Sequence, residues 1–186
     1  MRGLLVNKVP KGKTNNRMRK SIFCHIKHLA VAVFATAMLV ACYPNTSYYH
    51  YDAIDLHGWD RAEVLEYNVP PVTEDGYYVE EIGIRADASF PYRSLCLVVD
   101  QWIIHTVKKE PGTFKSDTVS IDIYDQEGQS VGRGVNLRQY AYPFRSVRLQ
   151  QGDSIAMRIR HHMKNKSIEG VANVGLKVYF QYGEAQ

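Results

Sequence analysis

Four residues near the N-terminus, Leu39-Val40-Ala41-Cys42, have the types and spacing needed for covalent lipid attachment. Small side chains at Ala41 and nearby let an extended chain enter a signal peptidase. The Cys42 thiolate is the best nucleophile in the chain to accept a diacylglyceryl group. Such a run directly after an apolar segment is typical of a bacterial lipobox, and it predicts that Cys42 becomes the first residue of the mature protein. The alternative is a short hydrophobic helix with an incidental buried cysteine.

The segment before Cys42 favours the lipobox interpretation. Residues 29–41 are apolar over 13 positions, which is too short for a membrane-spanning helix of ~20 residues but suits the apolar part of a signal peptide. Basic residues precede this run: Arg17, Arg19, Lys20 and Lys27. We therefore expect residues 1–41 to be a lipoprotein signal peptide, and Met18 is an alternative start that would give a leader of ordinary length.

The formal net charge of +4 is a property of this leader. Eight of the 23 Lys and Arg precede Cys42, and none of the 19 Asp and Glu does. The mature chain keeps 15 basic and 19 acidic residues, a net charge of −4, so the composition gives no support to nucleic-acid binding. After export Cys96 would be left as a lone thiol, and the domain must therefore rely on its core rather than on a disulfide.

Beyond the lipobox we expect a flexible, tyrosine-rich tether over residues 42–57 and a single domain over residues 58–182. The run at 95–107 is apolar on both faces at Leu97-Val98-Val99, which predicts a central strand. Other alternating runs predict strands at 62–69, 78–86, 118–124, 146–149, 154–160 and 174–180. Seven to eight short strands predict an all-β, antiparallel β-sandwich, jelly-roll-like or alternatively immunoglobulin-like.

Three constellations suggest chemistry, and each has a simpler interpretation. Residues 128–132 match the G-x-S-x-G nucleophile elbow around Ser130, but a hairpin signal precedes them and no helix follows, so a glycine turn is favoured. His161 and His162 are adjacent in a strand and point to opposite faces, so they cannot easily share a metal ion. Trp59 and Trp102 allow sugar stacking, although packing is the commoner fate of such rings. We expect no catalytic, cofactor or metal site, and hence no enzyme.

Several motifs in a fixed order resemble the GldH-type gliding-motility lipoproteins of Bacteroidetes. They are Gly58-Trp59, Pro91-Tyr92, Asp117-Thr118, the glycines at 128, 132 and 134, Gly152-Asp153, and above all Met163-Lys164 followed by residues 168–176. The chain departs from the family at Gln129-Ser130-Val131, where an aromatic is common, and at Asn173, where aspartate is common. The resemblance spans about Cys42 to Tyr182. It implies a lipid-anchored component of the gliding apparatus with no known enzymatic residues to carry over.

These observations together predict a non-enzymatic cell-envelope lipoprotein that binds the membrane through its N-terminal lipid and meets envelope proteins of the gliding or secretion machinery. The alternative is a glycan- or ligand-binding lipoprotein of the same architecture. Cys42 is followed directly by Tyr43 and Pro44 rather than by an aspartate, and no acidic run comes after it. By analogy with lipoprotein sorting signals, this favours the outer membrane with the domain on its periplasmic face.

Two further kinds of site are expected in the mature domain. Thr118 and Ser154 each follow an aspartate and precede an apolar residue, as in O-glycosylation sites of exported Bacteroidetes proteins, although ordinary turn chemistry explains the same pattern. Lys164, Lys166 and Glu169 lie in a polar connection expected to be exposed, where partner binding commonly occurs. The alternative is a purely structural connection locked by Gly170 and Gly175.

Overall fold

The computed structural model describes residues 45–106 and 111–182, so Cys42 and the predicted signal peptide lie outside the described residues. Every regular element in this part of the chain is a β-strand. In chain order they are β1 (Thr46–Ala53), β2 (Trp59–Asp60), β3 (Leu65–Val69), β4 (Gly76–Ala86), β5 (Ser94–Ile104), β6 (Thr113–Asp122), β7 (Arg138–Leu149), β8 (Ser154–His161), β9 (Ser167–Ile168) and β10 (Val171–Phe180).

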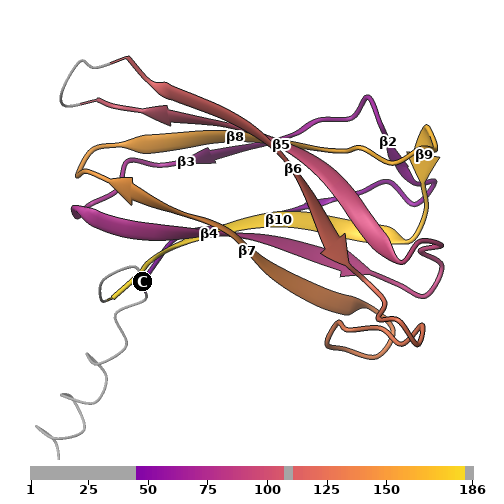
Figure 1. The fold of residues 1–186 in the computed structure, drawn as a ribbon. Helices are drawn as coiled ribbons and strands as arrows, with labels where there is room; N and C mark the ends of the chain where they lie inside the picture. The colour runs from indigo at the N-terminus through magenta and orange to yellow at the C-terminus, as the bar shows by residue number, and fades with distance from the viewer. Residues whose placement is uncertain (1–44, 107–110, 183–186) are drawn as a thin grey trace, which may run out of the picture. The chain divides into compact units, whose positions relative to one another are not determined.

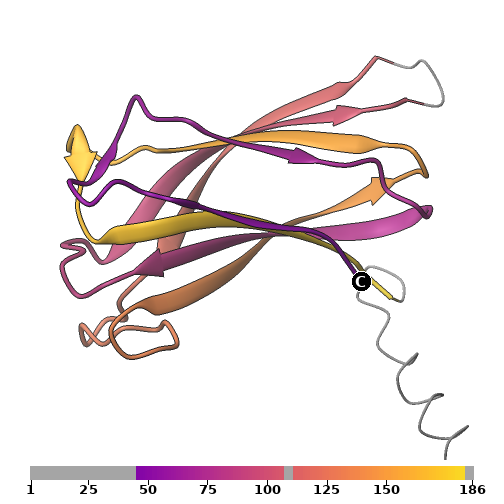
Figure 2. The same ribbon diagram turned by 180° about the vertical axis from the view of Figure 1, so that it is seen from behind.

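The eight long strands form two antiparallel sheets that face each other as two layers (Figures 1 and 2). One sheet has the order β1-β10-β4-β7 and the other has the order β3-β8-β5-β6. The pairings are nested, since β5 pairs with β6, β4 with β7, β3 with β8 and β1 with β10. This is the strand arrangement of a jelly roll. The predicted β-sandwich is therefore confirmed, and its topology follows the first of the two expected alternatives.

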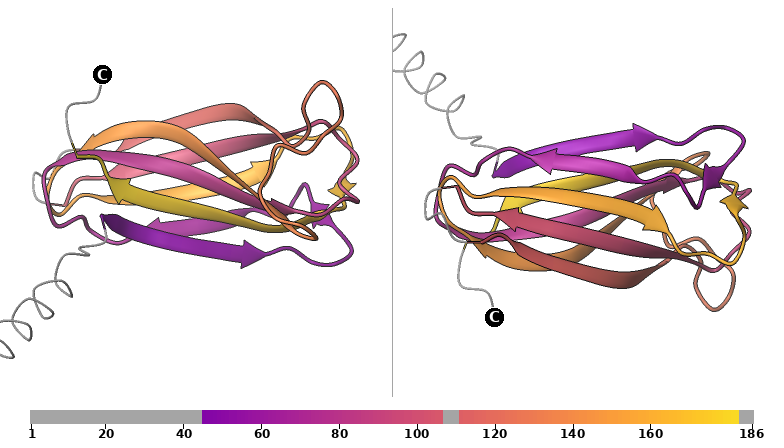
Figure 3. Two further views of the ribbon diagram at one scale, coloured as in Figure 1. Left: turned by 90° about the horizontal axis from the view of Figure 1, so that it is seen from below. Right: turned by 90° about the horizontal axis from the view of Figure 1, so that it is seen from above.

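The sandwich has two ends that carry different parts of the chain (Figures 1 and 3). At the N-terminal end β1 begins and β10 finishes, and connections 70–75 and 150–153 pass between the sheets. The far end carries connections 54–64, 87–93, 123–137 and 162–170. The short β2 and β9 pair with each other at this far end, with Trp59 opposite Ile168.

The core lies between the sheets and follows the alternation seen in the sequence. Val174, Leu176 and Val178 are fully buried on β10, as expected for the inner face of a strand. Leu97, Val98 and Val99 are all buried, and β5 has neighbours on both sides, which confirms the predicted central strand.

Two expectations about the chain were wrong. The segment expected to be a flexible tether contains β1, which pairs with β10 from Thr46 to Ala53. Its alternation was hidden because the inward-facing positions of this edge strand, Tyr48, His50 and Asp52, are aromatic or polar. Strand β7 begins at Arg138 rather than near Ser146 and runs through Pro143. An edge strand tolerates this proline because one side of its backbone has no ladder partner.

Candidate functional site

The predicted partner residues Lys164, Lys166 and Glu169 are all exposed, on the connection between β8 and β10 at the far end. This connection is held firmly by its backbone. Strand β9 pairs with β2, the Arg61 N–H donates to the Lys166 carbonyl at 2.7 Å, and the Arg61 guanidinium donates to the Lys164 carbonyl. The side chains of a rigidly held loop can meet a partner without a large ordering cost.

Beneath this connection lies a packed aromatic pair. Trp59 is fully buried, and its ring centroid lies 5.3 Å from that of His161, which is also fully buried. Burial lowers the pKa of His161, so its ring is neutral at pH 7. His162, next in the chain, is exposed, as the opposite-face prediction requires. Trp59 and His161 are therefore support for the loop above them.

Gly170 fixes the exit of the connection. Its φ is +81°, a conformation that side chains rarely adopt, and an added Cβ would overlap the backbone of Phe90. The Gly170 carbonyl also accepts a hydrogen bond from the Asp87 N–H at 2.9 Å. Gly170 therefore has the structural role that the alternative interpretation gave it. The exposed side chains of Lys164, Lys166 and Glu169 can still contact a partner.

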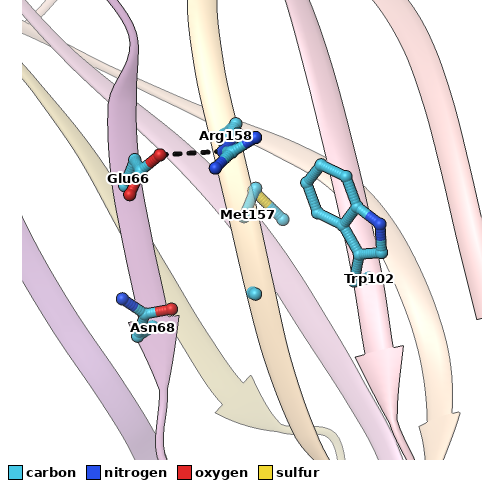
Figure 4. Close-up of a pocket in the computed structure, with 6 residues that line it drawn as sticks. Glu66, Asn68, Trp102, Met157 and Arg158 are labelled. Atoms are coloured by element: carbon cyan, nitrogen blue, oxygen red, sulfur yellow. Dashed lines mark hydrogen bonds and ion pairs between the residues drawn. The ribbon is translucent and has the colours of Figure 1, made fainter. Parts of the chain in front are cut away.

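A second candidate site is a shallow hollow of about 310 Å³ on the outer face of the β3-β8-β5-β6 sheet (Figure 4). Two neighbouring rows of paired residues cross the sheet there. One row consists of Asn68, Ala156, Trp102 and Phe114, and the next consists of Glu66, Arg158, Asp100 and Ser116. The small Ala156 between Asn68 and Trp102 leaves the space that forms the hollow.

One charged side chain and one aromatic ring lie next to the ring of Trp102. The Arg158 guanidinium lies 5.4 Å from the Trp102 ring centroid and pairs with Glu66 at 2.8 Å. The ring of Phe114 lies 4.8 Å from that of Trp102. An aromatic face beside carboxylate, amide and guanidinium groups suits a sugar, whose C–H face stacks while its hydroxyls form hydrogen bonds.

The sequence singled out two tryptophans for this chemistry, and the structure separates them. Trp59 belongs to the core, whereas Trp102 is half-buried on the outer face. The other lining residues, Glu66, Asn68 and Arg158, were not foreseen. Alternation along β3 and β8 indicated their outward direction, but only the pairing register brings them together.

The interior contains a polar chain that joins the sheets. Glu80 of β4 is fully buried and accepts a hydrogen bond from the Gln101 amide of β5; the Gln101 carbonyl accepts from Arg145 of β7, which also pairs with Asp117 of β6. Burial raises the pKa of Glu80 to about 7, and the charges of Arg145 and Lys115 oppose that rise. Glu80 Oε2 has no hydrogen-bond partner among the described residues, so ionisation of this carboxyl is costly.

The remaining predicted positions fall outside these sites. The Ser130 hydroxyl lies 2.7 Å from the Tyr140 hydroxyl in a turn with Gly128 at φ +76°, and no helix follows it, as expected for a turn. A strand was predicted to begin at Thr118, but Thr118 is exposed in the middle of β6, so its expected place at the start of a strand was wrong. Ser154 is half-buried at the start of β8.

The part of the chain that the structure describes contains neither a cluster of metal ligands nor a membrane-spanning helix. The His, Cys, Asp and Glu side chains of residues 45–106 and 111–182 form no group of three that could hold a metal ion. The same residues contain no helix long and apolar enough to cross a membrane.

Comparison with known proteins identifies a family for this chain. A family model described as GldH lipoprotein matches residues 46–178, from the start of β1 almost to the end of β10. No curated protein matches the sequence significantly. A solved structure described as Eiger TNF from S. frugiperda aligns with 14% identity over 77% of this chain and 91% of that chain, with a TM-score of 0.31. A likeness of that size carries no argument about function.

Proposed function

Since this chain belongs to the GldH lipoprotein family, we propose that it is a non-enzymatic component of a cell-envelope assembly, anchored by lipid on Cys42. The lipobox and its leader support the anchor, and the absence of an aspartate directly after Cys42 supports the periplasmic face of the outer membrane. The assembly in question is the gliding apparatus, because the sequence resembles gliding-motility lipoproteins of Bacteroidetes. Its partners are proteins of the gliding or secretion machinery.

The observation that carries this proposal is the rigid presentation of Lys164, Lys166 and Glu169. The three side chains are exposed, while the backbone that bears them is held by β2, Arg61 and Gly170. Lys166 Nζ lies 3.9 Å from Asp60 Oδ2, but both groups are open to water, where such a pair contributes little. These charges are therefore available to a protein partner.

The test replaces Lys164, Lys166 and Glu169 with alanine in cells of the source organism. Surface changes of this kind alter the free energy of unfolding by less than about 0.5 kcal/mol. We expect normal protein levels, loss of partner cross-links and impaired gliding or secretion.

A matched control replaces three exposed charges elsewhere, Arg133, Arg148 and Glu127, and should leave cross-links intact. Unchanged cross-links and unchanged motility in the Lys164, Lys166 and Glu169 variant would contradict the proposed surface.

The hollow beside Trp102 favours a second function, binding of a glycan or similar polar ligand to the outer face. A panel of envelope oligosaccharides followed by NMR should shift the resonances of Asn68, Trp102 and Arg158, and Trp102→Ala should abolish those shifts. Shifts that persist in this variant would place the ligand elsewhere.

A further inference from the structure

The first described residue, Asn45, is fixed to the last strand at the N-terminal end of the sandwich. Its side-chain amide donates to the Phe180 carbonyl at 3.2 Å, and its own carbonyl accepts from the Phe180 N–H at 2.7 Å. Asn45 lies three residues after Cys42, and three residues span at most ~11 Å. An acyl group on Cys42 would therefore hold this end of the sandwich close to the lipid.

Exposed aromatic and aliphatic side chains gather at the same end on both sheets. On one sheet Tyr182 is 69% exposed with its ring 5.1 Å from that of Phe180, and Tyr77 at the start of β4 is 38% exposed. On the other sheet Phe114 and Ile104 are 53% and 48% exposed, where β5 ends and β6 begins. Figure 1 shows that the end of β5 and the start of β6 lie on the same side of the domain as the end of β10 and the start of β4.

The Tyr182 side of this surface is tied to the sheet. The Gln181 N–H donates to the Tyr77 carbonyl at 2.8 Å, and the Ser146 hydroxyl donates to the Gln181 side chain at 3.2 Å. The Phe180 ring packs edge-on against buried Tyr78 at 5.3 Å. These rings are thus presented to solvent by an ordered strand end.

We infer that this end of the sandwich rests on the lipid surface, with Tyr77, Phe114 and Tyr182 in the headgroup region. Aromatic rings are favoured there because the ring leaves water while a tyrosine hydroxyl stays hydrated. The inference rests on the proposed lipidation of Cys42. In this orientation the strands run away from the membrane. Strands of 10–12 residues then place the far-end loop, with Lys164 and Lys166, about 35 Å from the bilayer.

The test uses the full lipidated chain in phosphatidylcholine vesicles that contain a headgroup spin-labelled lipid, which quenches nearby tryptophans. Trp102 is paired with Phe114 near the N-terminal end, whereas Trp59 is buried at the far end. We expect part of the tryptophan emission to be quenched. Trp102→Phe should remove that part and leave the unquenched emission of Trp59.

A pair of double variants assigns the contact to the aromatic surface. Phe114→Ser with Tyr182→Ser should abolish the quenching of Trp102 while the protein still floats with the vesicles. The matched control, Leu56→Ser with Val135→Ser, alters residues that are 100% and 87% exposed at the far end and should keep the quenching.

The outcomes separate this inference from the proposed anchor. A lipidated chain that floats with vesicles but shows no quenching of Trp102 overturns the docking and leaves the anchor standing. Quenching that survives the Phe114 and Tyr182 changes overturns the assigned surface. A mature chain without acyl mass on Cys42 overturns both.

Discussion

The ring of Tyr51 on β1 lies over Gly83 on β4, although the two strands are separated by β10. Tyr51 is paired with Gly175 of β10, which is paired in turn with Gly83. A Cβ added at Gly175 would come within 2.5 Å of the Tyr51 ring, and one at Gly83 would overlap its hydroxyl end. The Arg85 guanidinium covers the ring at 4.2 Å, and burial raises the pKa of Tyr51 to about 12. Two glycines thus make the groove that seats the first strand.

This relationship predicts a reversal of sign in a double-mutant cycle. Gly83→Ala should lower the free energy of unfolding by about 1–3 kcal/mol, because the added methyl meets the Tyr51 ring. In a Tyr51→Ala background the same change should be neutral or stabilising by about 0.5–1 kcal/mol, because glycine is unfavourable within a strand. Urea unfolding of the four proteins measures the coupling. Equal losses in both backgrounds would show that the ring and Gly83 do not interact.

The Tyr51 groove also shows why the sequence predicted the sandwich better than its edges. Strand β10 was recognisable because Val174, Leu176 and Val178 alternate with less apolar residues over a buried face. Strand β1 was not recognisable because its inward positions are aromatic or polar, and because Tyr51 packs outward on glycines of two other strands, a contact that no local pattern encodes. In β7, Pro143 obscured the alternation of Tyr140, Tyr142 and Phe144, which only an edge position explains.

The candidate sites divide in the same way. Lys164, Lys166 and Glu169 were identified because polarity and neighbouring glycines are local properties of the sequence. The hollow beside Trp102 depends on the register of β3, β8 and β5, which sets Asn68 and Glu66 across β8 from that ring. Register is determined by long-range pairing, so one strand's sequence does not reveal it.

Glu80 should make stability depend on pH. Its pKa in the folded protein is about 7, against an ordinary value of 4.5, so the folded state binds the proton more tightly than the unfolded state. The stabilisation is complete below about pH 4.5 and is lost as pH rises to about 7, with a total change of up to about 3 kcal/mol.

Glu80→Gln removes this titration and should therefore make the protein more stable than wild type at pH 8, with a smaller difference at pH 5. Urea unfolding at the two values measures it, and the comparison with wild type cancels the other titrating groups. If the difference between the two proteins does not change with pH, folding does not raise the pKa of Glu80.

Gly170 and Gly128 form a matched pair that separates backbone strain from lack of space. Both have positive φ, at +81° and +76°, but an added Cβ meets the Phe90 backbone at Gly170 and nothing within 4 Å at Gly128. Gly128→Ala should cost about 1 kcal/mol from strain alone. Gly170→Ala should cost at least about 2 kcal/mol more, because backbone atoms of Phe90 must move. Thermal unfolding of the two variants is the measurement, and similar losses would show that Phe90 does not restrain the loop.

Thr118 and Ser154 differ in their access to a modifying enzyme. Thr118 is exposed on the outer face, whereas Ser154 is half-buried beside Asp153, which is itself buried and pairs with His105 at 3.1 Å. If the chain is O-glycosylated, we expect Thr118→Ala to remove more glycan mass than Ser154→Ala. Intact mass of protein from the native organism measures this. An unshifted mass in the wild-type protein would show that neither Thr118 nor Ser154 is glycosylated. The preceding aspartates, Asp117 and Asp153, would then have only turn or ion-pair roles.

Replacement of the Cys42 thiol by a hydroxyl tests the anchor on which the proposed role depends. Two or three acyl chains, at about 0.8 kcal/mol for each buried CH₂ group, hold a protein stably on a membrane, whereas one chain is marginal. We expect Cys42→Ser to abolish labelling with a palmitate analogue and to leave the leader uncleaved. Cys96→Ser is the control, because that half-buried thiol lies within β5 and should not accept lipid. Normal processing of the Cys42→Ser protein would exclude the lipobox, and removal of the domain by protease on intact cells would place it on the cell surface instead of the periplasmic face.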